Sequence, residues 1–339
     1  MKSIKEKFET LHCHSKVSDG VMTHEKILET CVENNIGVVA FTDHDSLPDI
    51  KTFNKLNSLR KHSTKWIVGI EISADKPKDF NIDFSPHIVG LFVDPFNKNL
   101  LEHCKLAQEA RRERMTEMVK NLKKLGFEIE EADCLNASKG EAVGRTHIVK
   151  ALKSKIENLE VLEKLRRKMQ LDAKTDEKIK KQYDEMMRRG EDQYPYVLFL
   201  SDNSYIKGVY KDYLYRIDLD KCVEIIRGAG GLSFFAHWFT EINKCGEKEL
   251  SKLLMENRID GVETVYAFYD DMREDFIRQR QILLNLVGKY HKFESGGVDA
   301  HTCEHLVDFA KDKWYARLTI GLTEKIILSG KADLKWSSF

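Results

Sequence analysis

The sequence predicts an α/β protein in which a barrel-like alternation of strands and helices is divided by a mostly helical insertion. Three observations support this prediction. The first hundred residues alternate apolar runs of strand length with segments of helical period, the middle of the chain consists of long charged segments, and the alternation returns after about residue 219. Because βαβ alternation is typical of sheets covered by helices, we expect parallel strands.

The first part of the chain, residues 1–98, begins with a strand at Phe8–Leu11. Thr23 is a typical N-cap residue for the helix that follows it, and later apolar runs have the length of buried strands. The expected elements after the first strand are a helix at 26–34, a strand at 37–42, a helix at 48–61, a strand at 66–72 and a strand at 87–93.

Residues 99–218 form the expected insertion, a helical cap subdomain. Charged residues dominate two segments, 100–125 and 146–189, each of which we expect to be a long helix. Residues 190–211 contain Pro195 and several tyrosines, which favours a partly extended loop or an edge segment.

The third part, residues 219–339, returns to the alternating pattern. Its strands are short apolar runs and its helices have amphipathic spacing. The expected elements are a helix at 220–228, a strand at 231–236, a helix at 247–257, a strand at 261–265, a helix at 270–290 and a strand at 294–298.

The composition excludes several classes of protein. Lys plus Arg equals Asp plus Glu at 55 each, so no overall field attracts nucleic acid or an anionic membrane. Seven scattered cysteines without CxxC spacing argue against a disulfide framework and against a zinc ribbon. The N-terminus is charged and no apolar run reaches membrane-spanning length. We therefore expect a cytoplasmic protein without membrane contact.

Two pairs of potential metal ligands have i, i+2 spacing, His12 with His14 and Asp299 with His301. Side chains alternate between the two faces of a β-strand, so residues two apart point the same way and can bind one ion. Both pairs follow predicted strands, and strand ends carry the chemistry of α/β barrels. The spacing predicts a metal site that brings the two ends of the chain together.

Further histidines and carboxylates fall at or just after predicted strands. Imidazole and carboxylate ligands together suit Mn, Zn or Fe rather than Ca²⁺. A lone histidine after a strand is more often structural than a ligand, but two spaced pairs favour metal binding. Nine residues exceed the needs of one ion, which indicates a multinuclear hydrolase. The nine are His12, His14, Asp19, His44, Glu71, His87, His237, Asp299 and His301.

These residues stand within a series of motifs that resembles the PHP (polymerase and histidinol phosphatase) family. The chain is similar in particular to bacterial PHP phosphoesterases that act on nucleoside bisphosphates or 5′-phosphorylated oligoribonucleotides. The resemblance extends from about Phe8 to the helix after His301. Its motifs in order are His-x-His, Ser18-Asp19-Gly20, Thr42-Asp43-His44-Asp45, Gly69-Ile70-Glu71, His87, Gly144-Arg145-Thr146-His147, Ala236-His237, Gly261-Val262-Glu263 and Asp299-x-His301.

The resemblance implies a distorted (β/α)7 TIM-like barrel with three divalent ions at the carboxyl ends of its strands. Mn²⁺ is the expected ion, and Zn²⁺ or Fe²⁺ are alternatives. By matching motif, the first ion would be held by His12, His14, Glu71 and Asp299, the second by Glu71, His87 and His237, and the third by Asp19, His44 and His301. Arg145 and His147 would be catalytic and substrate-binding residues that contact the substrate phosphate from the insertion.

The chain departs from the family pattern at two positions beside the ligands. Trp238 stands where proline is usual and Val298 where serine is usual. Neither change removes a ligand. Residues 153–189 are also longer than in the smaller relatives, and residues 150–190 hold 13 Lys or Arg against 8 Asp or Glu. This excess is either a solvated helical face or a basic cap for a polyanionic substrate.

We therefore expect a metal-dependent phosphoesterase in which a metal-bridging hydroxide attacks a phosphate ester of a nucleotide or short single-stranded oligonucleotide. One alternative is a small phosphomonoesterase similar to histidinol phosphatase. Another is a PHP module that binds metal without catalysis. Glu263 lies on the predicted strand at 261–265 near these ligands, where packing, a hydrogen bond to a ligand histidine and catalysis are all open.

Overall fold

The computed structural model describes residues 7–59, 62–82, 84–138, 142–212, 215–266 and 273–339. The chain divides into two compact units. The barrel unit consists of Met1–Lys105 and Arg216–Phe339, and the helical unit of Leu106–Tyr215. The helical unit falls inside the expected insertion at 99–218, and its role as a cap stays a prediction.

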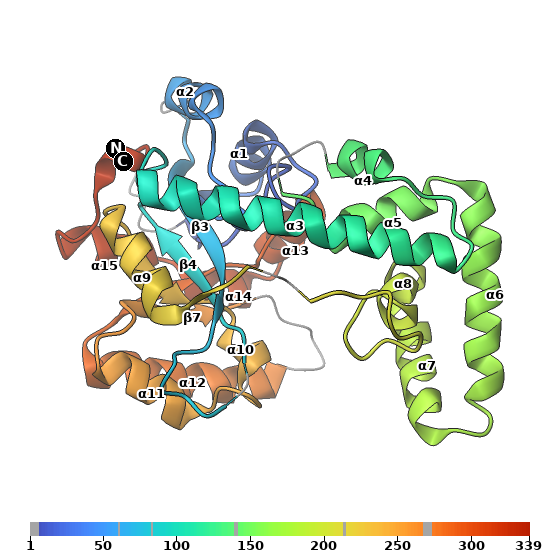
Figure 1. Ribbon diagram of the computed structural model, residues 1–339. Coiled ribbons are helices and arrows are strands. Elements are labelled where there is room, and N and C mark those ends of the chain that lie inside the picture. Colours follow the sequence, from blue (N-terminus) through green and yellow to red (C-terminus); the bar gives the residue numbers. More distant parts are fainter. Residues whose placement is uncertain (1–6, 60–61, 83, 139–141, 213–214, 267–272) are drawn as a thin grey trace. The chain divides into compact units, whose positions relative to one another are not determined.

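The barrel unit contains a nearly closed sheet, part of which is seen between the helices in Figure 1. Its strands are hydrogen-bonded in the order β1-β2-β3-β4-β6-β7-β8, and β5 pairs with β3 outside this path. A bridge between Cys13 and Ala300, together with a 2.9 Å bond from Leu11 N to Gly296 O, joins β8 to β1. The predicted barrel is confirmed. The strands are β1 (Phe8–Thr10), β2 (Ile36–Phe41), β3 (Lys65–Asp75), β4 (His87–Leu91), β5 (Ile217–Asp218), β6 (Leu232–Phe235), β7 (Gly261–Val265) and β8 (Phe293–Gly296).

The expectation that all strands are parallel is wrong for β4, which is antiparallel to both β3 and β6. The reason is the link from β3 to β4, residues 76–86, whose described part contains no helix. A parallel connection needs a crossover of a dozen or more residues, usually helical, whereas an antiparallel neighbour needs only a short return.

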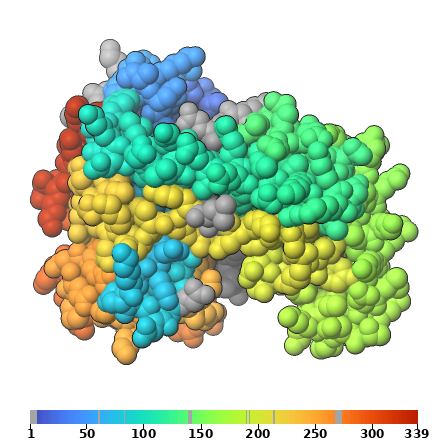
Figure 2. Space-filling model, viewed as in Figure 1, coloured from blue at the N-terminus to red at the C-terminus, as the bar shows by residue number. Residues whose placement is uncertain are grey.

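Helices lie around the outside of the sheet, and in the space-filling view the yellow atoms of α9 cover the middle of this face of the barrel unit (Figure 2). Thr23 caps α1 as predicted, because its hydroxyl accepts a hydrogen bond from Lys26 N. The predicted helix start at Asp270 and the predicted helix end at Lys61 lie outside the described residues. The helices of this unit are α1 (His24–Glu33), α2 (Ile50–Ser58), α9 (Leu219–Gly228), α10 (Trp238–Glu241), α11 (Glu247–Met255), α12 (Arg273–Tyr290), α13 (Cys303–Lys311), α14 (Lys313–Ala316) and α15 (Leu322–Leu328).

Alternating residues of the strands pack into two apolar clusters. On β2, Val39 and Phe41 belong to the cluster that includes the covering helices, whereas Val38 and Ala40 belong to an inner cluster with Leu322 of α15. Period-two alternation explains this division, because successive side chains of a strand face opposite sides of the sheet. β2 is therefore buried on both faces, which explains its continuous apolar sequence.

The helical unit has an apolar core of its own. The expected helix at 146–189 is wrong in its continuity, because the structure breaks it into α5, α6 and α7. Asp176 marks the second break, since its side chain caps α7 at Lys178 N and Ile179 N. The segment 190–211, expected to be a partly extended loop or an edge segment, contains the short helix α8, and its residues 199–211 form neither helix nor strand. The helices are α3 (Lys98–Lys124), which begins in the barrel unit, α4 (Glu131–Ser138), α5 (Arg145–Lys153), α6 (Ile156–Asp172), α7 (Glu177–Arg189) and α8 (Tyr194–Leu198). No helix among the described residues has both the length and the apolar character needed to cross a membrane.

Candidate metal centre

The two spaced pairs meet where β8 joins β1. His12 and His14 follow the end of β1, and their spacer Cys13 pairs with Ala300, the spacer of the second pair. Cys13 is fully buried and its backbone N–H donates to Thr42 Oγ1 at 3.0 Å. The two spacers therefore join the two backbone segments, while the side chains of the four predicted ligands point away from the spacer side chains, as the i, i+2 pattern predicts.

Glu71 and His87 lie beside the two spaced pairs because of a strand direction that the sequence did not reveal. Glu71 lies in the middle of β3, which runs on to Asp75, and not at the strand end as expected. His87 is the first residue of β4 and pairs with Ser73. Because β4 is antiparallel, its beginning lies beside the carboxyl end of β3. The reversed strand thus brings a histidine to the end of the barrel that holds the other ligands.

The first group of ligand atoms surrounds one oxygen of Asp299. Its Oδ1 lies 3.0 Å from His14 Nε2 and 3.4 Å from His12 Nε2, and those two nitrogens are 3.1 Å apart. Oε2 of Glu71 lies 3.3 Å from each of the same nitrogens. Two carboxylate oxygens and two imidazole nitrogens therefore converge from three strands.

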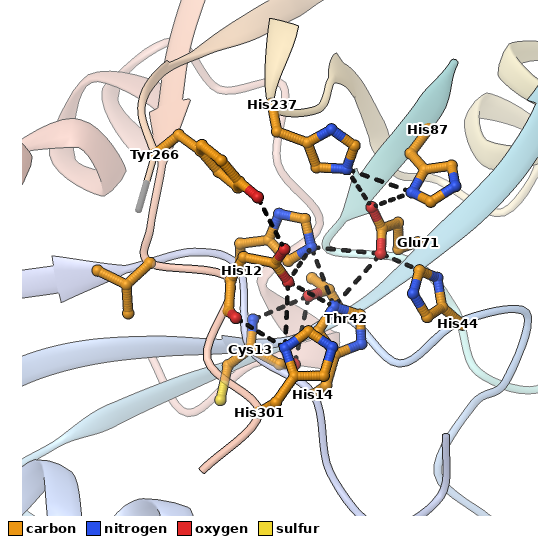
Figure 3. A network of polar contacts seen from close by, with 12 residues as sticks. His12, Cys13, His14, Thr42, His44, Glu71, His87, His237, Tyr266 and His301 are labelled. Carbon is orange, nitrogen blue, oxygen red and sulfur yellow. Dashed lines mark hydrogen bonds and ion pairs between the residues drawn. The ribbon is translucent and has the colours of Figure 1, made fainter. Parts of the chain in front are cut away.

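The two oxygens of Glu71 face different groups (Figure 3). Oε1 lies 2.9 Å from His87 Nδ1 and 3.0 Å from His237 Nε2, whereas Oε2 lies 2.9 Å from His44 Nδ1 and also faces the first group. His87 and His237 approach each other to 3.2 Å between ring nitrogens. One buried carboxylate thus lies between two sets of imidazoles, in the arrangement of a bridging ligand.

A third group forms around Asp19. Its Oδ1 lies 3.4 Å from His301 Nε2 and 3.6 Å from His14 Nδ1, and its Oδ2 lies 3.9 Å from His44 Nε2. The ligand atoms of His14, Asp19, His44 and His301 all lie within 4.8 Å of one another. His14 and His44 therefore each take part in two groups, one through each ring nitrogen. The structure brings all nine predicted residues into contact with at least one other of the nine.

Several ring orientations are fixed by hydrogen bonds on the side away from the other ligands. His12 Nδ1 lies 2.8 Å from Glu263 Oε1, and His301 Nδ1 lies 2.8 Å from the backbone oxygen of Asp299. An N–H that donates outward leaves the other ring nitrogen as an acceptor directed inward. Of the alternatives open for Glu263, the structure supports the hydrogen bond to a ligand histidine.

The backbone is strained at three positions of this centre. Asp45, His237 and Asp299 adopt φ angles of 44°, 31° and 50°, in the left-handed region that side chains other than glycine rarely occupy. Each such residue costs roughly 1–3 kcal/mol, and such strain clusters at functional sites. The strain lets a ligand turn out of the strand direction, as at His237, which follows β6.

Burial and opposite charge act together on the ionisable groups. Burial alone would raise the pKa of Glu71, but the surrounding His44, His12 and His87 outweigh it and hold that pKa well below its usual range. Burial alone would lower the pKa of His14, but Asp299 and Glu71 raise it to about 10. The pKa of His87 is lowered, first by burial and then by the neighbouring histidines. The centre therefore depends on charge balance between imidazoles and carboxylates.

The donor set fits divalent ions. Asp299 Oδ1 and His44 Nδ1 are buried and have no hydrogen-bond partner among the described residues, although each faces other ligand atoms. Burying such polar atoms without partners is costly. Mixed imidazole and carboxylate donors suit Mn, Zn or Fe, and histidines oriented by outer carboxylates are typical of metal sites. The groups that could hold ions include His12, His14 and Glu71; His44, Glu71 and His87; and His14, Asp19, His44 and His301.

Arg145 and His147 belong to the helical unit. Gly144 caps α5, and its N–H donates to His147 Nδ1 at 2.9 Å, so the neutral ring carries its proton on Nε2. Arg145 donates to Leu200 O at 3.2 Å, and its guanidinium lies over the rings of Tyr196 and Tyr210 at 5.7 and 5.8 Å. The predicted catalytic and substrate-binding roles of both residues stay predictions.

Sequence reasoning assigned no role to several residues that contact the centre. His24 Nε2 lies 3.6 Å from Asp43 Oδ2, and Asp43 also accepts hydrogen bonds from Ser15 and Ser18. His103 Nε2 lies 3.1 Å from Asp45 Oδ1. A histidine on a helix gives no signal of its own, so the sequence could not pair His24 with Asp43 or His103 with Asp45.

Comparisons with known proteins point to one family. The PHP domain family matches residues 10–283. A phosphoribosyl 1,2-cyclic phosphate 1,2-diphosphodiesterase of Eggerthella lenta is 29% identical over 147 residues, which are 43% of this chain and 54% of that protein. A 3′,5′-nucleoside bisphosphate phosphatase of Chromobacterium violaceum is 26% identical over 42% of this chain and 48% of its own. The 5′-3′ exoribonuclease Rnm of Escherichia coli is 29% identical over 42% and 47%. The chain spans about half the length of these curated relatives.

Two solved structures share the fold over most of their length. One is a protein of Bifidobacterium adolescentis whose assignment as a metal-dependent phosphoesterase is inferred. It has a TM-score of 0.63 and 21% identity, and the match covers 87% of this chain and 88% of the other. The second, described as an amidohydrolase of Chromobacterium violaceum, has a TM-score of 0.60, 20% identity and coverage of 87% of both chains. At these identities the likeness concerns the fold.

Proposed function

The chain belongs to the PHP family, as its motifs predicted, and from this premise we propose that it is a metal-dependent phosphoesterase. The observation that supports this proposal most strongly is the position of Glu71. Its two oxygens face two different sets of imidazoles, at 2.9–3.0 Å on one side and 2.9–3.3 Å on the other. A carboxylate in this position suits two neighbouring cations, the arrangement that enzymes use for displacement at phosphorus.

The proposed substrate is a phosphate ester of a nucleotide or of a short single-stranded oligonucleotide. The names of the relatives support this class, because they describe a phosphoribosyl cyclic phosphate, a nucleoside bisphosphate and RNA. The hydrolysis would consume water and release either phosphate or a shorter nucleotide. We propose that the helical unit decides between these two products.

The donor set supports divalent ions, and we propose three, with Mn²⁺ first and Zn²⁺ or Fe²⁺ as alternatives. Bound ions supply Lewis-acid chemistry, which lowers the pKa of a water molecule and offsets negative charge on a phosphate. The chain's own task is to orient the ligands. Glu263 keeps the proton of His12 on Nδ1, and the Asp299 carbonyl keeps that of His301 on Nδ1.

Arg145 is proposed to bind a phosphate oxygen pair. Its planar guanidinium can donate two parallel hydrogen bonds, a geometry that suits phosphate. The flanking rings of Tyr196 and Tyr210 support this proposal, since they hold the guanidinium plane in place. His147, with its proton on Nε2, is the proposed donor to the leaving oxygen.

The experiment compares three substrates with the purified full chain and added Mn²⁺. Release of phosphate is measured from a nucleoside 3′,5′-bisphosphate and from histidinol phosphate, and release of mononucleotides from a 5′-phosphorylated oligonucleotide. Preference for either nucleotide substrate supports the proposal, whereas preference for histidinol phosphate supports the small-phosphomonoesterase alternative. Substitution Glu71→Gln keeps the shape but removes the charge, and we expect a loss of at least about a hundredfold in turnover.

The same preparation also tests the alternative that the chain is a non-catalytic metal-binding module. Metal content after purification and after addition of Mn²⁺ is measured beside turnover. Bound ions with no hydrolysis of any of the three substrates would favour the binding module and contradict the proposed activity.

A further inference from the structure

Tyr266 lies beside the candidate metal centre but belongs to none of the motifs that led to it. It directly follows β7, and its hydroxyl lies 3.4 Å from Oδ2 of Asp299. Its ring packs against His237 with a centroid distance of 5.4 Å. The close view shows the phenol directed into the ligand network beside His12 and His237 (Figure 3).

The two oxygens of Asp299 have different surroundings. Oδ1 faces His14 Nε2 at 3.0 Å and His12 Nε2 at 3.4 Å and has no hydrogen bond among the described residues. Oδ2 faces the phenol of Tyr266. The backbone of Asp299 is strained, with φ of 50°, and its carbonyl is engaged by His301 Nδ1. The backbone contacts of Asp299 therefore fix the position of its Cα, but they do not fix the rotation of its carboxylate group.

An aspartate carboxylate can rotate about its χ2 torsion unless a neighbour holds it, because terminal torsions of this kind are broad and roughly two-fold. A donor on one oxygen removes this freedom. Tyrosine is suited to the task, since its hydroxyl stays protonated below about pH 10 and so donates to the carboxylate without adding a charge to the centre.

The ring of Tyr266 is itself held in place by a row of aromatic side chains. It stacks on Phe239 with a centroid distance of 6.3 Å and an angle of 12°, and Phe239 stacks on Phe276 at 5.2 Å and 26°. Phe276 in turn packs against Tyr315 at 5.5 Å. Aromatic pairs of this kind add about 0.5–1.5 kcal/mol beyond their buried area. The row ties the phenol to α10, α12 and α14.

We propose that Tyr266 is a positioning residue of the metal centre, whose hydroxyl holds Asp299 by Oδ2 so that Oδ1 faces the nitrogens of His12 and His14. This inference rests on the proposed function and concerns the ion that Asp299 would share with those two histidines. Residues that orient a metal ligand in this way typically contribute ten- to a hundredfold to metal affinity.

The test compares Tyr266→Phe with Tyr290→Phe in the full chain. Both variants lose one phenol hydroxyl, but Tyr290 lies at the end of α12 and contacts Ser251 Oγ at 2.7 Å. The metal-free proteins are titrated with Mn²⁺, and free Mn²⁺ is followed by electron paramagnetic resonance. We expect one class of site in Tyr266→Phe to bind about 10- to 100-fold more weakly, and Tyr290→Phe to match the wild type.

Turnover provides a second readout. A positioning role predicts that the activity of Tyr266→Phe recovers when the Mn²⁺ concentration is raised, with KM for the substrate unchanged. An unchanged Mn²⁺ affinity would overturn the inference, and so would a raised KM at unchanged affinity, which would place the phenol on the substrate. Wild-type protein that binds Mn²⁺ but hydrolyses nothing would contradict the proposed activity alone, because the titration does not depend on turnover.

Discussion

His12 Nδ1 and Glu263 Oε1 lie 2.8 Å apart and are both fully buried, so the end of β1 is joined to β7 although β8 lies between them in the sheet. The other oxygen of Glu263 accepts a hydrogen bond from His237 N at 2.7 Å. One carboxylate therefore orients two of the nine predicted ligands, one through its side chain and the other through its strained backbone.

Glu263→Gln tests this relationship. The amide has one acceptor oxygen where the carboxylate has two, so either the His12 N–H or the His237 N–H would face an NH₂ group. We expect Mn²⁺ affinity to fall about 10- to 100-fold, measured by titration of the metal-free protein. Glu294→Gln is the matched control, because Glu294 lies on neighbouring β8 and bonds Lys325 Nζ at 2.7 Å. Equal affinities in the two variants would contradict the orienting role.

Gly297→Ala tests the closure of the barrel. A Cβ at this position would lie 2.7 Å from both His12 N and Thr10 Oγ1, so β1 must move away from the end of β8. We expect a destabilisation of about 1–3 kcal/mol in urea unfolding together with weaker metal binding. Gly288→Ala in α12, where a Cβ meets nothing within 4 Å, should instead stabilise by about 0.5–1 kcal/mol. A Gly297→Ala variant as stable as the wild type would show that the junction tolerates the added carbon.

Arg145→Ala tests the proposed phosphate contact. Loss of charge-assisted hydrogen bonds costs about 1.5–3 kcal/mol, so we expect KM to rise about 10- to 100-fold in steady-state kinetics. Arg145→Lys should recover only part of this loss, because an ammonium lacks the planar pair of donors. Arg278→Ala, which removes an exposed pair with Asp275 in the barrel unit, should leave KM unchanged. An unaltered KM in Arg145→Ala would remove this residue from the binding site.

Glu9→Gln tests the effect of burial on a carboxyl group away from the metal centre. Burial raises the pKa of Glu9 above 4.5, although hydrogen bonds from Thr323 and Gly321 act in the opposite direction. A raised pKa in the folded state means that the group adds stability below the unfolded pKa and loses it as pH rises through the folded value. We therefore expect the free energy of unfolding of the wild type, relative to the variant, to fall with rising pH.

Urea unfolding of both proteins between about pH 4 and about pH 7 measures this difference, in which all other titrating groups cancel. A difference that grows with pH would mean that the hydrogen bonds to the N-terminus of α15 outweigh burial.

The sequence predicted the barrel and the convergence of the ligand pairs because both depend on local spacing. His12 and His14 must share one side of an extended chain, whatever the rest of the fold is. The direction of β4 was not predicted, because buried strands read alike in either direction. The short helix-free link after Asp75 was the available signal.

The supporting contacts were less accessible to sequence reasoning. Glu263 stands in a motif, but its partners His12 and His237 are 251 and 26 residues away, so only tertiary structure pairs them. Tyr266 had no signal at all, since a tyrosine after a strand is usual in any core. The break before α7 was marked by Asp176, a typical N-cap residue that the charged pattern around it concealed.

The pairing of β1 with β8 also sets the order of events during synthesis. Asp299 and His301 each leave the ribosome 287 residues after their counterparts His12 and His14. At about 5–20 residues per second, this interval lasts roughly 15–60 s. Throughout it, the N-terminal strand has no partner on one edge, and any ion that it meets finds at most part of its ligands. The site that His12 and His14 would share with Asp299 therefore becomes complete only after the last strand of the barrel has been made.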